Sequence, residues 1–207
     1  MAQVPIEIID LRRERTGLLN LVIENMNTSQ DQYSFSVLDV SKSLELEFAV
    51  HDDTDIDIFI PSLIKRKIAW RGYHPFLICL FDTPINVDGV RNLFSVDIAR
   101  DGFAAITMHN VSSVIIPENR ISSYLMFQIA FFALKFSGGN INFHPEDRGC
   151  LFDYREKKAG IVDAIRRPYI CDFCKKELEK SNGQVSPDFY SFKEHLVHCK
   201  LPRRERL

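Results

Sequence analysis

Short apolar runs with the β-branched or alternating composition of strands recur along the chain. They cover residues 6–9, 33–40, 76–81, 93–98 and 103–108. The run at 76–81 is continuously apolar, which predicts a strand that is buried on both faces. Asp101-Gly102 predicts a turn between the last two strands, and the acidic, polar stretch 51–57 predicts a loop.

Apolar residues at helical spacing alternate with these runs. They predict helices at 18–26, 58–70, 119–136, 160–166, 175–180 and 191–198. The helix at 119–136 is apolar around most of its circumference, so we expect it to be buried on more than one side, and Gly138-Gly139 ends it. The order of strands and helices predicts an α/β sandwich with a mixed sheet.

The composition is that of a soluble globular protein, because apolar residues make up 45% of the 207 and charged residues 26%. A net charge of -2 argues against attraction of the whole surface to nucleic acid or to an anionic membrane. No apolar stretch is long enough for a membrane span. The first residues also lack the basic and then apolar pattern of a secretory signal. We therefore expect a cytoplasmic protein without membrane contact.

Cysteine and histidine gather in the last third of the chain with spacings typical of metal ligands. The candidate ligands are His144, Cys150, Cys171, Cys174, His195, His198 and Cys199. A C-x2-C turn such as Cys171 to Cys174 lets two thiolates meet one zinc ion at about 2.3 Å each. A redox pair is the alternative, but we do not expect this pair to open a helix after a strand of a βαβ unit. An odd total of 5 Cys also favours reduced thiols over disulfides, so we predict a structural zinc ion.

Two sets of residues compete to complete this zinc site. In one, His144 and Cys150 join the C-x2-C pair and give a Cys3His site. In the other, His195 and Cys199 (or His198) close a finger of the CCHC type, whose loop is longer than the roughly 12 residues of the common finger. Two zinc ions are a third option, for which the chain has too few ligands without sharing. The spacing alone leaves these alternatives open.

The composition changes after Gly139, where Gly, His, Cys and charged residues become dominant. This part of the chain has too few apolar residues to hold itself together without a metal. We therefore predict two domains. Residues 1–139 form the α/β domain, and residues 140–207 form a small Cys/His zinc-binding module with a basic tail.

Other residues with chemical potential have a plainer interpretation. His74 and His109 each stand alone at a predicted strand end, and with Asp97 they are candidates for a titratable cluster in a cleft. Cys79 lies in an apolar strand, where a thiol behaves as a small buried hydrophobe. The basic tail at 200–206 can contact phosphate, but a solvated terminus is its more usual role.

Residues 119–174 resemble the archaemetzincins, which are zinc-dependent peptidases of the zincin fold. The family pattern is HExxHxxGxxHCxxxxCxM, followed further along the chain by CxxC. His144 matches the third His of this pattern, Cys150 the second Cys, and Cys171 and Cys174 the final CxxC. The resemblance implies a zincin-like mixed-sheet sandwich and a structural zinc ion held by the Cys residues.

The chain departs from the family pattern at the ligands of the catalytic zinc. It has Phe127-Gln128-Ile129-Ala130-Phe131 where the family has His-Glu-x-x-His. Phe cannot ligate a metal, and Gln cannot take a proton from water. Pro145 stands in place of the first family Cys, which leaves His144 free to be the fourth ligand of the structural ion. The resemblance thus implies no catalytic zinc and a Cys3His site made of His144, Cys150, Cys171 and Cys174.

These observations predict a pseudoenzyme, a non-catalytic and zinc-stabilised protease-like scaffold that acts by binding a protein partner. No complete catalytic motif is present, so an enzyme is the less expected outcome. Two alternatives stay open. One is a hydrolase that uses a site other than HExxH in the same cleft. The other is a nucleic-acid-binding module built on the finger-like C-terminal segment and the basic tail.

Overall fold

The structure of the chain is a computed structural model, and it describes the chain in separate stretches. The described residues are 3–12, 17–38, 54–56, 76–98, 102–111, 120–138, 141, 144–145, 148–155, 160–166 and 168–180. The predicted helices at 58–70 and 191–198 and the basic tail lie outside the described residues. So do the candidate site residues His74, His195, His198 and Cys199.

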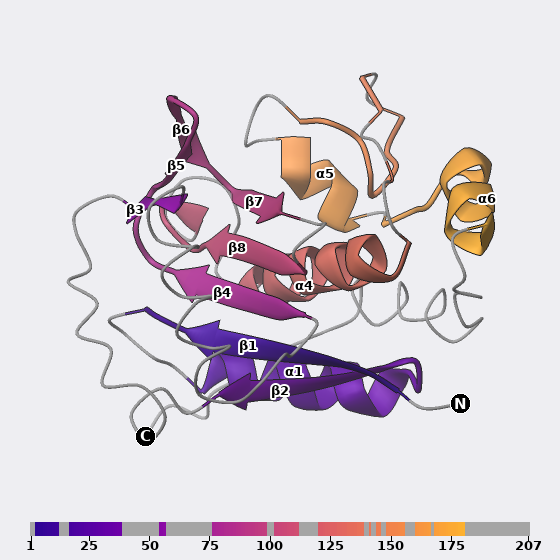
Figure 1. The fold of residues 1–207 in the computed structure, drawn as a ribbon, viewed down its shortest axis with the longest axis horizontal. Helices are drawn as coiled ribbons and strands as arrows, with labels where there is room; N and C mark the ends of the chain where they lie inside the picture. Colours follow the sequence, from indigo (N-terminus) through magenta and orange to yellow (C-terminus); the bar gives the residue numbers. More distant parts are fainter. Residues whose placement is uncertain are drawn as a thin grey trace.

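A 5-stranded sheet with the order β2-β1-β4-β8-β7 runs through the molecule (Figure 1). Its strands are β1 (Val4–Asp10), β2 (Tyr33–Leu38), β4 (Leu77–Phe81), β7 (Ser95–Ile98) and β8 (Phe103–Thr107). The first four strands of this order are parallel to one another, and the edge strand β7 runs antiparallel to β8. The predicted mixed sheet is therefore confirmed.

Successive side chains of each strand enter two different apolar clusters, one on each face of the sheet. In β4, Ile78 belongs to the first cluster, whereas its neighbours Leu77 and Cys79 belong to the second. All 5 residues of β4 are buried, as the continuous apolar run predicts. Cys79 is one of these core residues, so its predicted role as a buried small hydrophobe is confirmed.

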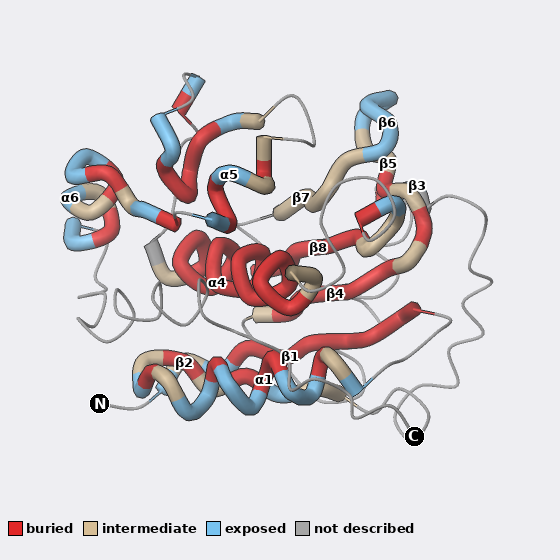
Figure 2. The backbone as a smooth tube through the Cα atoms, turned by 180° about the vertical axis from the view of Figure 1, so that it is seen from behind, coloured by how far each residue is buried: buried red, intermediate tan, exposed pale blue. Residues whose placement is uncertain are grey.

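Helices α1 (Leu18–Ser29) and α4 (Ile121–Gly138) pack on the face that carries the first cluster (Figure 1). The inward face of α1 is the one that its helical spacing predicts, with Leu19, Val22, Ile23 and Met26 buried. Figure 2 shows α4 buried along nearly its whole length. A helix that is apolar around its circumference needs cover on several sides, and α4 has the sheet, α1 and the C-terminal segment as neighbours.

A 3-stranded sheet, with the order β3-β5-β6, contributes to the cluster on the other face. Its strands are β3 (Thr54–Asp55), β5 (Ile85–Val87) and β6 (Val90–Leu93). Asp88 and Gly89 have positive φ angles of 48° and 76°, as a two-residue turn between antiparallel strands requires. This sheet corrects two predictions. The expected loop at 51–57 contains β3, and Leu93 ends β6 instead of beginning the strand at 93–98.

Helices α5 (Gly160–Arg166) and α6 (Asp172–Lys180) lie beside α4 (Figure 1). Ile161, Ile165 and Leu178 belong to the same apolar cluster as α4, so the C-terminal segment shares a core with the sheet. The division of the chain into 1–139 and 140–207 stays a prediction. Within the described stretches, no helix combines the length and the apolarity needed to cross a membrane.

Candidate metal centre

Backbone pairing brings together two pieces of chain that are distant in sequence. His144 pairs with Asp153, and Cys150 pairs with Tyr169, in isolated parallel bridges. Leu151 N donates a hydrogen bond to Tyr169 O at 2.7 Å. These contacts place His144 and Cys150 next to the segment that leads into α6, where the C-x2-C pair lies.

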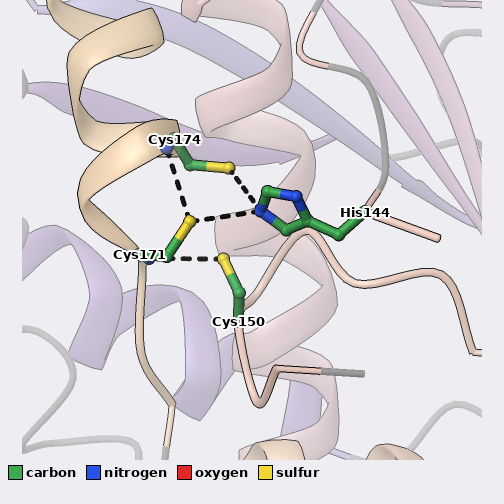
Figure 3. A group of neighbouring side chains, drawn as sticks. All are labelled: His144, Cys150, Cys171 and Cys174. Carbon is green, nitrogen blue, oxygen red and sulfur yellow. Dashed lines mark hydrogen bonds between the residues drawn. The ribbon is translucent and has the colours of Figure 1, made fainter. Parts of the chain in front are cut away.

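The side chains of His144, Cys150, Cys171 and Cys174 converge on one point (Figure 3). All four are buried, and their ligand atoms lie within 4.8 Å of one another. His144 Nε2 is 3.1 Å from Cys171 Sγ and 3.1 Å from Cys174 Sγ. In a tetrahedral site with Zn–S near 2.3 Å and Zn–N near 2.0 Å, the ligand atoms are about 3.5–3.8 Å apart. The donor set and its size therefore fit zinc, and this buried tetrad can hold the ion.

Backbone N–H groups point at two of the three sulfur atoms. Cys171 N donates to Cys150 Sγ at 3.4 Å, and Cys174 N donates to Cys171 Sγ at 3.5 Å. Lys175 N donates to Cys171 O at 2.9 Å, which begins the hydrogen bonding of α6. N–H donors of this kind stabilise negative charge on sulfur, and the thiolate is the form that binds a metal.

The three thiols differ in how readily they lose a proton when no ion is bound. Burial raises the pKa of Cys150 and of Cys174 above the usual thiol value, and the shift is large for Cys174. Burial acts in the same direction on Cys171, but the hydrogen bonds that it accepts, the backbone N–H of Cys174 first among them, outweigh that effect and lower its pKa. Cys171 is therefore the first of the three to become a thiolate, and a bound cation would favour deprotonation of the other two.

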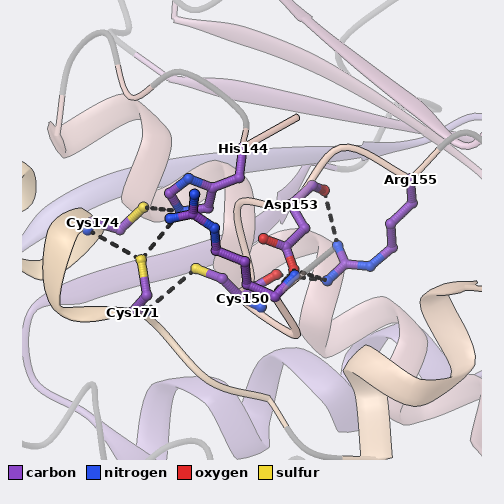
Figure 4. A network of polar contacts seen from close by, with 7 residues as sticks. His144, Cys150, Asp153, Arg155, Cys171 and Cys174 are labelled. Carbon is purple, nitrogen blue, oxygen red and sulfur yellow. Dashed lines mark hydrogen bonds and ion pairs between the residues drawn. The ribbon is translucent and has the colours of Figure 1, made fainter. Parts of the chain in front are cut away.

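Asp153 organises the loop that carries Cys150 (Figure 4). Its Oδ2 accepts hydrogen bonds from Cys150 N at 2.7 Å and from Arg148 N at 2.8 Å. Gly149, between those two residues, has a φ of 77°, a conformation that other residues adopt only with strain. Our sequence analysis missed Asp153. A signal for it does exist, since an Asp shortly after a Gly-containing turn often bonds back to backbone N–H groups.

Helix α4 presents no metal ligand at residues 127–131. Phe127 and Phe131 are 3% and 6% exposed, and the ring of Phe131 lies 5.5 Å from that of Phe152, centroid to centroid. Gln128 is also buried, and its Oε1 accepts a hydrogen bond from Ser95 Oγ at 3.1 Å. In the part of the chain that the structure describes, the tetrad is the only group of three or more His, Cys, Asp or Glu side chains placed to hold a metal.

Asp97 and His109 are not brought together. Asp97 Oδ1 accepts a hydrogen bond from Lys135 Nζ at 2.6 Å in a largely buried ion pair. His109 Nε2 lies 2.8 Å from Asn110 Nδ2 beyond the other end of β8. Asp97 is paired with Ala104 near the start of β8, whereas His109 lies beyond the last residue of that strand, Thr107. The strand from Ala104 to Thr107 spans about 10 Å at roughly 3.3 Å per residue. Asp97 and His109 therefore do not form a shared acid-base site.

The position of the C-x2-C pair differs in one respect from our expectation. Helix α6 begins at Asp172, so the pair does open a helix. Among the described residues before it, the chain forms the bridge at Tyr169 and no strand of the sheet, so these residues show no βαβ unit. The two further ligands beside the pair favour metal over a redox role. The alternative ligands His195, His198 and Cys199 lie outside the described residues.

Solved structures provide the informative comparison, because no family model and no curated protein matches the chain. An archaemetzincin from Methanopyrus kandleri is 12% identical with a TM-score of 0.58, over 87% of this chain and 96% of that one. A zinc-dependent peptidase from Methanocorpusculum labreanum is 14% identical with a TM-score of 0.61, over 84% and 99%. An archaemetzincin from Archaeoglobus fulgidus is 15% identical with a TM-score of 0.51, also over 84% and 99%. The chain therefore has an archaemetzincin-like fold.

Proposed function

We propose that this chain, on an archaemetzincin-like fold, is a non-catalytic scaffold that a structural zinc ion stabilises and that acts by binding a protein partner. We place it in the cytoplasm, where thiols stay reduced. The fold is common to peptidases and does not by itself assign an activity. The proposal rests on what the side chains of α4 and of the metal centre can do.

The buried stretch 127–131 of α4, which offers no metal ligand, is the observation that carries the proposal. A hydrolytic zinc site needs ligands that hold the ion and an open position for water. Phe127 and Phe131 offer neither, because both rings are buried against other side chains. Gln128 has no acid-base chemistry, and its amide oxygen is engaged with Ser95. A zinc ion in the tetrad would have four protein ligands and no open position, which is the arrangement of a structural site.

The edges of the main sheet indicate where a partner can bind. Asn27 of α1 and Gln30, the residue directly after that helix, close the edge strand β2, because their side-chain amides pair with its outward backbone groups. Asn27 bonds both N and O of Phe35 at 2.8 Å. Gln30 bonds N and O of Tyr33 at 2.7 and 2.8 Å. These amides take the place of a neighbouring strand, which is one way to protect an edge from pairing.

The opposite edge, β7, has no such cover among the described residues. Thr107 N donates to Phe94 O at 2.9 Å, so the alternation of an antiparallel ladder turns the backbone groups of Ser95 and Asp97 outward. Both side chains point to α4 and are held there by Gln128 and Lys135. A fixed edge strand with outward N–H and C=O groups can accept an extended peptide as a further strand. An extended segment of a protein is therefore the partner that we propose.

The experiment combines zinc analysis with a peptidase assay. Wild type should bind about one zinc ion per chain, and Cys150→Ser should lose it because four-ligand sites of this kind need every thiolate. Cys79→Ala, a buried cysteine on the other face of the sheet, is the matched control and should keep the ion. Cys199→Ser should keep it too. Loss of zinc in Cys199→Ser would instead support the finger alternative.

The peptidase assay tests the absence of catalysis. Zinc-loaded wild type should cleave no member of a mixed peptide library above the background of a heat-inactivated sample. Cleavage that a chelator abolishes and zinc restores would overturn the non-catalytic proposal. The nucleic-acid alternative depends on residues beyond 180, outside the described part of the chain, and stays a prediction.

A further inference from the structure

The segment 148–155, which carries Cys150, contacts both the metal centre and helix α4. Its last residues alternate like a strand. The side chains of Asp153 and Arg155 are 0% and 10% exposed, whereas Tyr154 between them is 60% exposed as a residue. Two charged side chains of this short segment therefore point into the protein. Charges are buried at a large cost unless hydrogen bonds and opposite charges compensate them.

Arg155 joins three parts of the structure (Figure 4). It donates from Nη2 to Cys150 O at 2.6 Å and from Nη1 to Asp153 O at 3.2 Å. Its guanidinium lies over the ring of Phe127 in α4, with 5.9 Å between Cζ and the ring centroid. A Cβ placed on Gly160 would lie 3.7 Å from Arg155 Cδ, so the aliphatic part of the side chain packs against the start of α5. One side chain thus connects the segment 148–155, called the ligand loop below, to two helices.

Charge gives Arg155 a second role. A zinc ion with three thiolates and a neutral imidazole has a formal charge of about -1, and the buried Asp153 adds another negative group. Arg155 Nη2 lies 3.8 Å from Asp153 Oδ2 and is bonded to the carbonyl of a ligand residue. A cation at this distance offsets part of the cost of burying these negative charges.

We propose that Arg155 is a positioning residue of the metal centre, which seats the ligand loop on Phe127 of α4 and so raises the zinc affinity of the tetrad. The proposal rests on the zinc site of the proposed function and is independent of partner binding. Coupling of this kind is reciprocal. If the contact with α4 strengthens zinc binding, then zinc binding favours the arrangement in which the loop covers Phe127.

The test measures zinc affinity by competition with a chromophoric chelator. Arg155→Met keeps much of the apolar stem and removes the charge and donors, and affinity should fall about 10- to 100-fold, as for other groups that orient metal ligands. Arg155→Lys keeps the charge but lacks the planar guanidinium. Its zinc affinity should lie between that of Arg155→Met and that of wild type. Arg166→Met is the matched control, because Arg166 is exposed on α5 and pairs with Asp163. Its affinity should equal that of wild type.

A second pair of variants tests the route through α4. Phe127→Leu removes the aromatic face under the guanidinium and should weaken zinc binding. The double variant Phe127→Leu with Arg155→Met should be no weaker than Arg155→Met alone, because the two residues act through one contact. If Arg155→Met does not fold, Arg155→Lys and Phe127→Leu provide the same comparison.

Three outcomes would overturn the inference. One is an affinity of Arg155→Met within about twofold of wild type. Another is an equal loss of thermal stability in the zinc-loaded and the chelator-treated protein, since a residue that only stabilises the fold acts on both forms alike. The third is a wild type without zinc, which would remove the zinc part of the proposed function as well. The partner-binding part of the proposed function would be unaffected, because variants of β7, described in the Discussion, test it separately.

Discussion

The three thiols of the tetrad show how single residues set the behaviour of the metal centre. Burial raises the pKa of Cys150 and Cys174, whereas accepted hydrogen bonds lower that of Cys171. Without an ion, the first two are neutral at physiological pH, which avoids three negative charges in a small buried space. With zinc bound, all three are thiolates, so binding of the metal must release protons.

We predict opposite effects of pH on the two forms of the protein. A thiol whose pKa is raised by folding stabilises the metal-free protein at low pH, and this stability is lost as pH rises from the ordinary thiol value toward the raised one. Zinc binding has the reverse dependence, and its affinity should fall roughly tenfold per unit decrease of pH for each proton released. Chelator competition between about pH 8 and about pH 6 measures the affinity. An affinity independent of pH over that range would contradict the assigned protonation states.

The gathering of the four tetrad residues could be predicted from sequence, but the residues that hold them in place could not. Cys171 and Cys174 form a local turn, and their spacing alone indicates a metal half-site. The choice of His144 and Cys150 needed the resemblance to a known family, because the residues alone left two closures open. Arg155 carries no local signal at all. Its partners include Phe127, which is distant in sequence, so only the folded structure reveals the contact.

At the scale of elements, α4 and the edge strand β7 behave as one unit. Gln128 and Lys135 reach from the helix to Ser95 and Asp97 of the strand. The Lys135–Asp97 pair is largely buried, with side chains 11% and 13% exposed, so loss of either partner would leave an uncompensated charge. These contacts hold the inner face of β7, and none of the described residues covers its outward backbone groups, which we propose as the site of a partner strand.

A proline in β7 tests this arrangement. Ser95→Pro removes an outward N–H group that takes no part in the sheet, and it should weaken binding of an extended peptide about tenfold or more. Ser95→Ala loses the same hydroxyl but keeps the N–H, so it should bind as wild type does. Peptides selected from a displayed library on the wild type, and then titrated against both variants, give the measurement. Equal affinity for the proline and alanine variants would show that the edge of β7 is not the binding surface.

The elements that sequence predicts well are those whose pattern is long or uniform. Helix α4 and strand β4 are apolar throughout, and their burial follows directly. The hairpin of β5 and β6 was missed, although Asp88-Gly89 is a typical turn pair, because strands of 3 and 4 residues are too short to show a period. Strand β3 has 2 residues and exists only through its pairing with β5.

At the scale of the whole molecule, the metal centre and the sheet share one apolar cluster. Cys150, Cys171 and Cys174 belong to the same cluster as the core residues of α4 and of the sheet face beneath it. Disturbance of the ligand loop is therefore expected to reach α4, whose Phe131 packs against Phe152 of that loop. A small metal module with its own separate core would behave differently.

Removal of zinc should show this coupling by hydrogen exchange. After chelation, amide exchange should rise first in segment 148–155 and in α6, and also in α4, because the packing over Phe127 and Phe131 loosens. Strands β5 and β6 belong to the other face of the sheet and provide an internal control with unchanged exchange. Faster exchange confined to residues beyond 139 would instead support two independently folding domains.

The closure of β2 by Asn27 and Gln30 has a consequence for self-association. A chain with two open sheet edges can add copies of itself at both ends and grow into a filament. Here the groups of Tyr33 and Phe35 are already bonded, so β2 cannot receive a second molecule at those positions. Within the described residues, copies that met through the edges of the 5-stranded sheet would use β7 against β7. Such a contact has twofold symmetry and is complete with two chains, so growth would stop at a dimer.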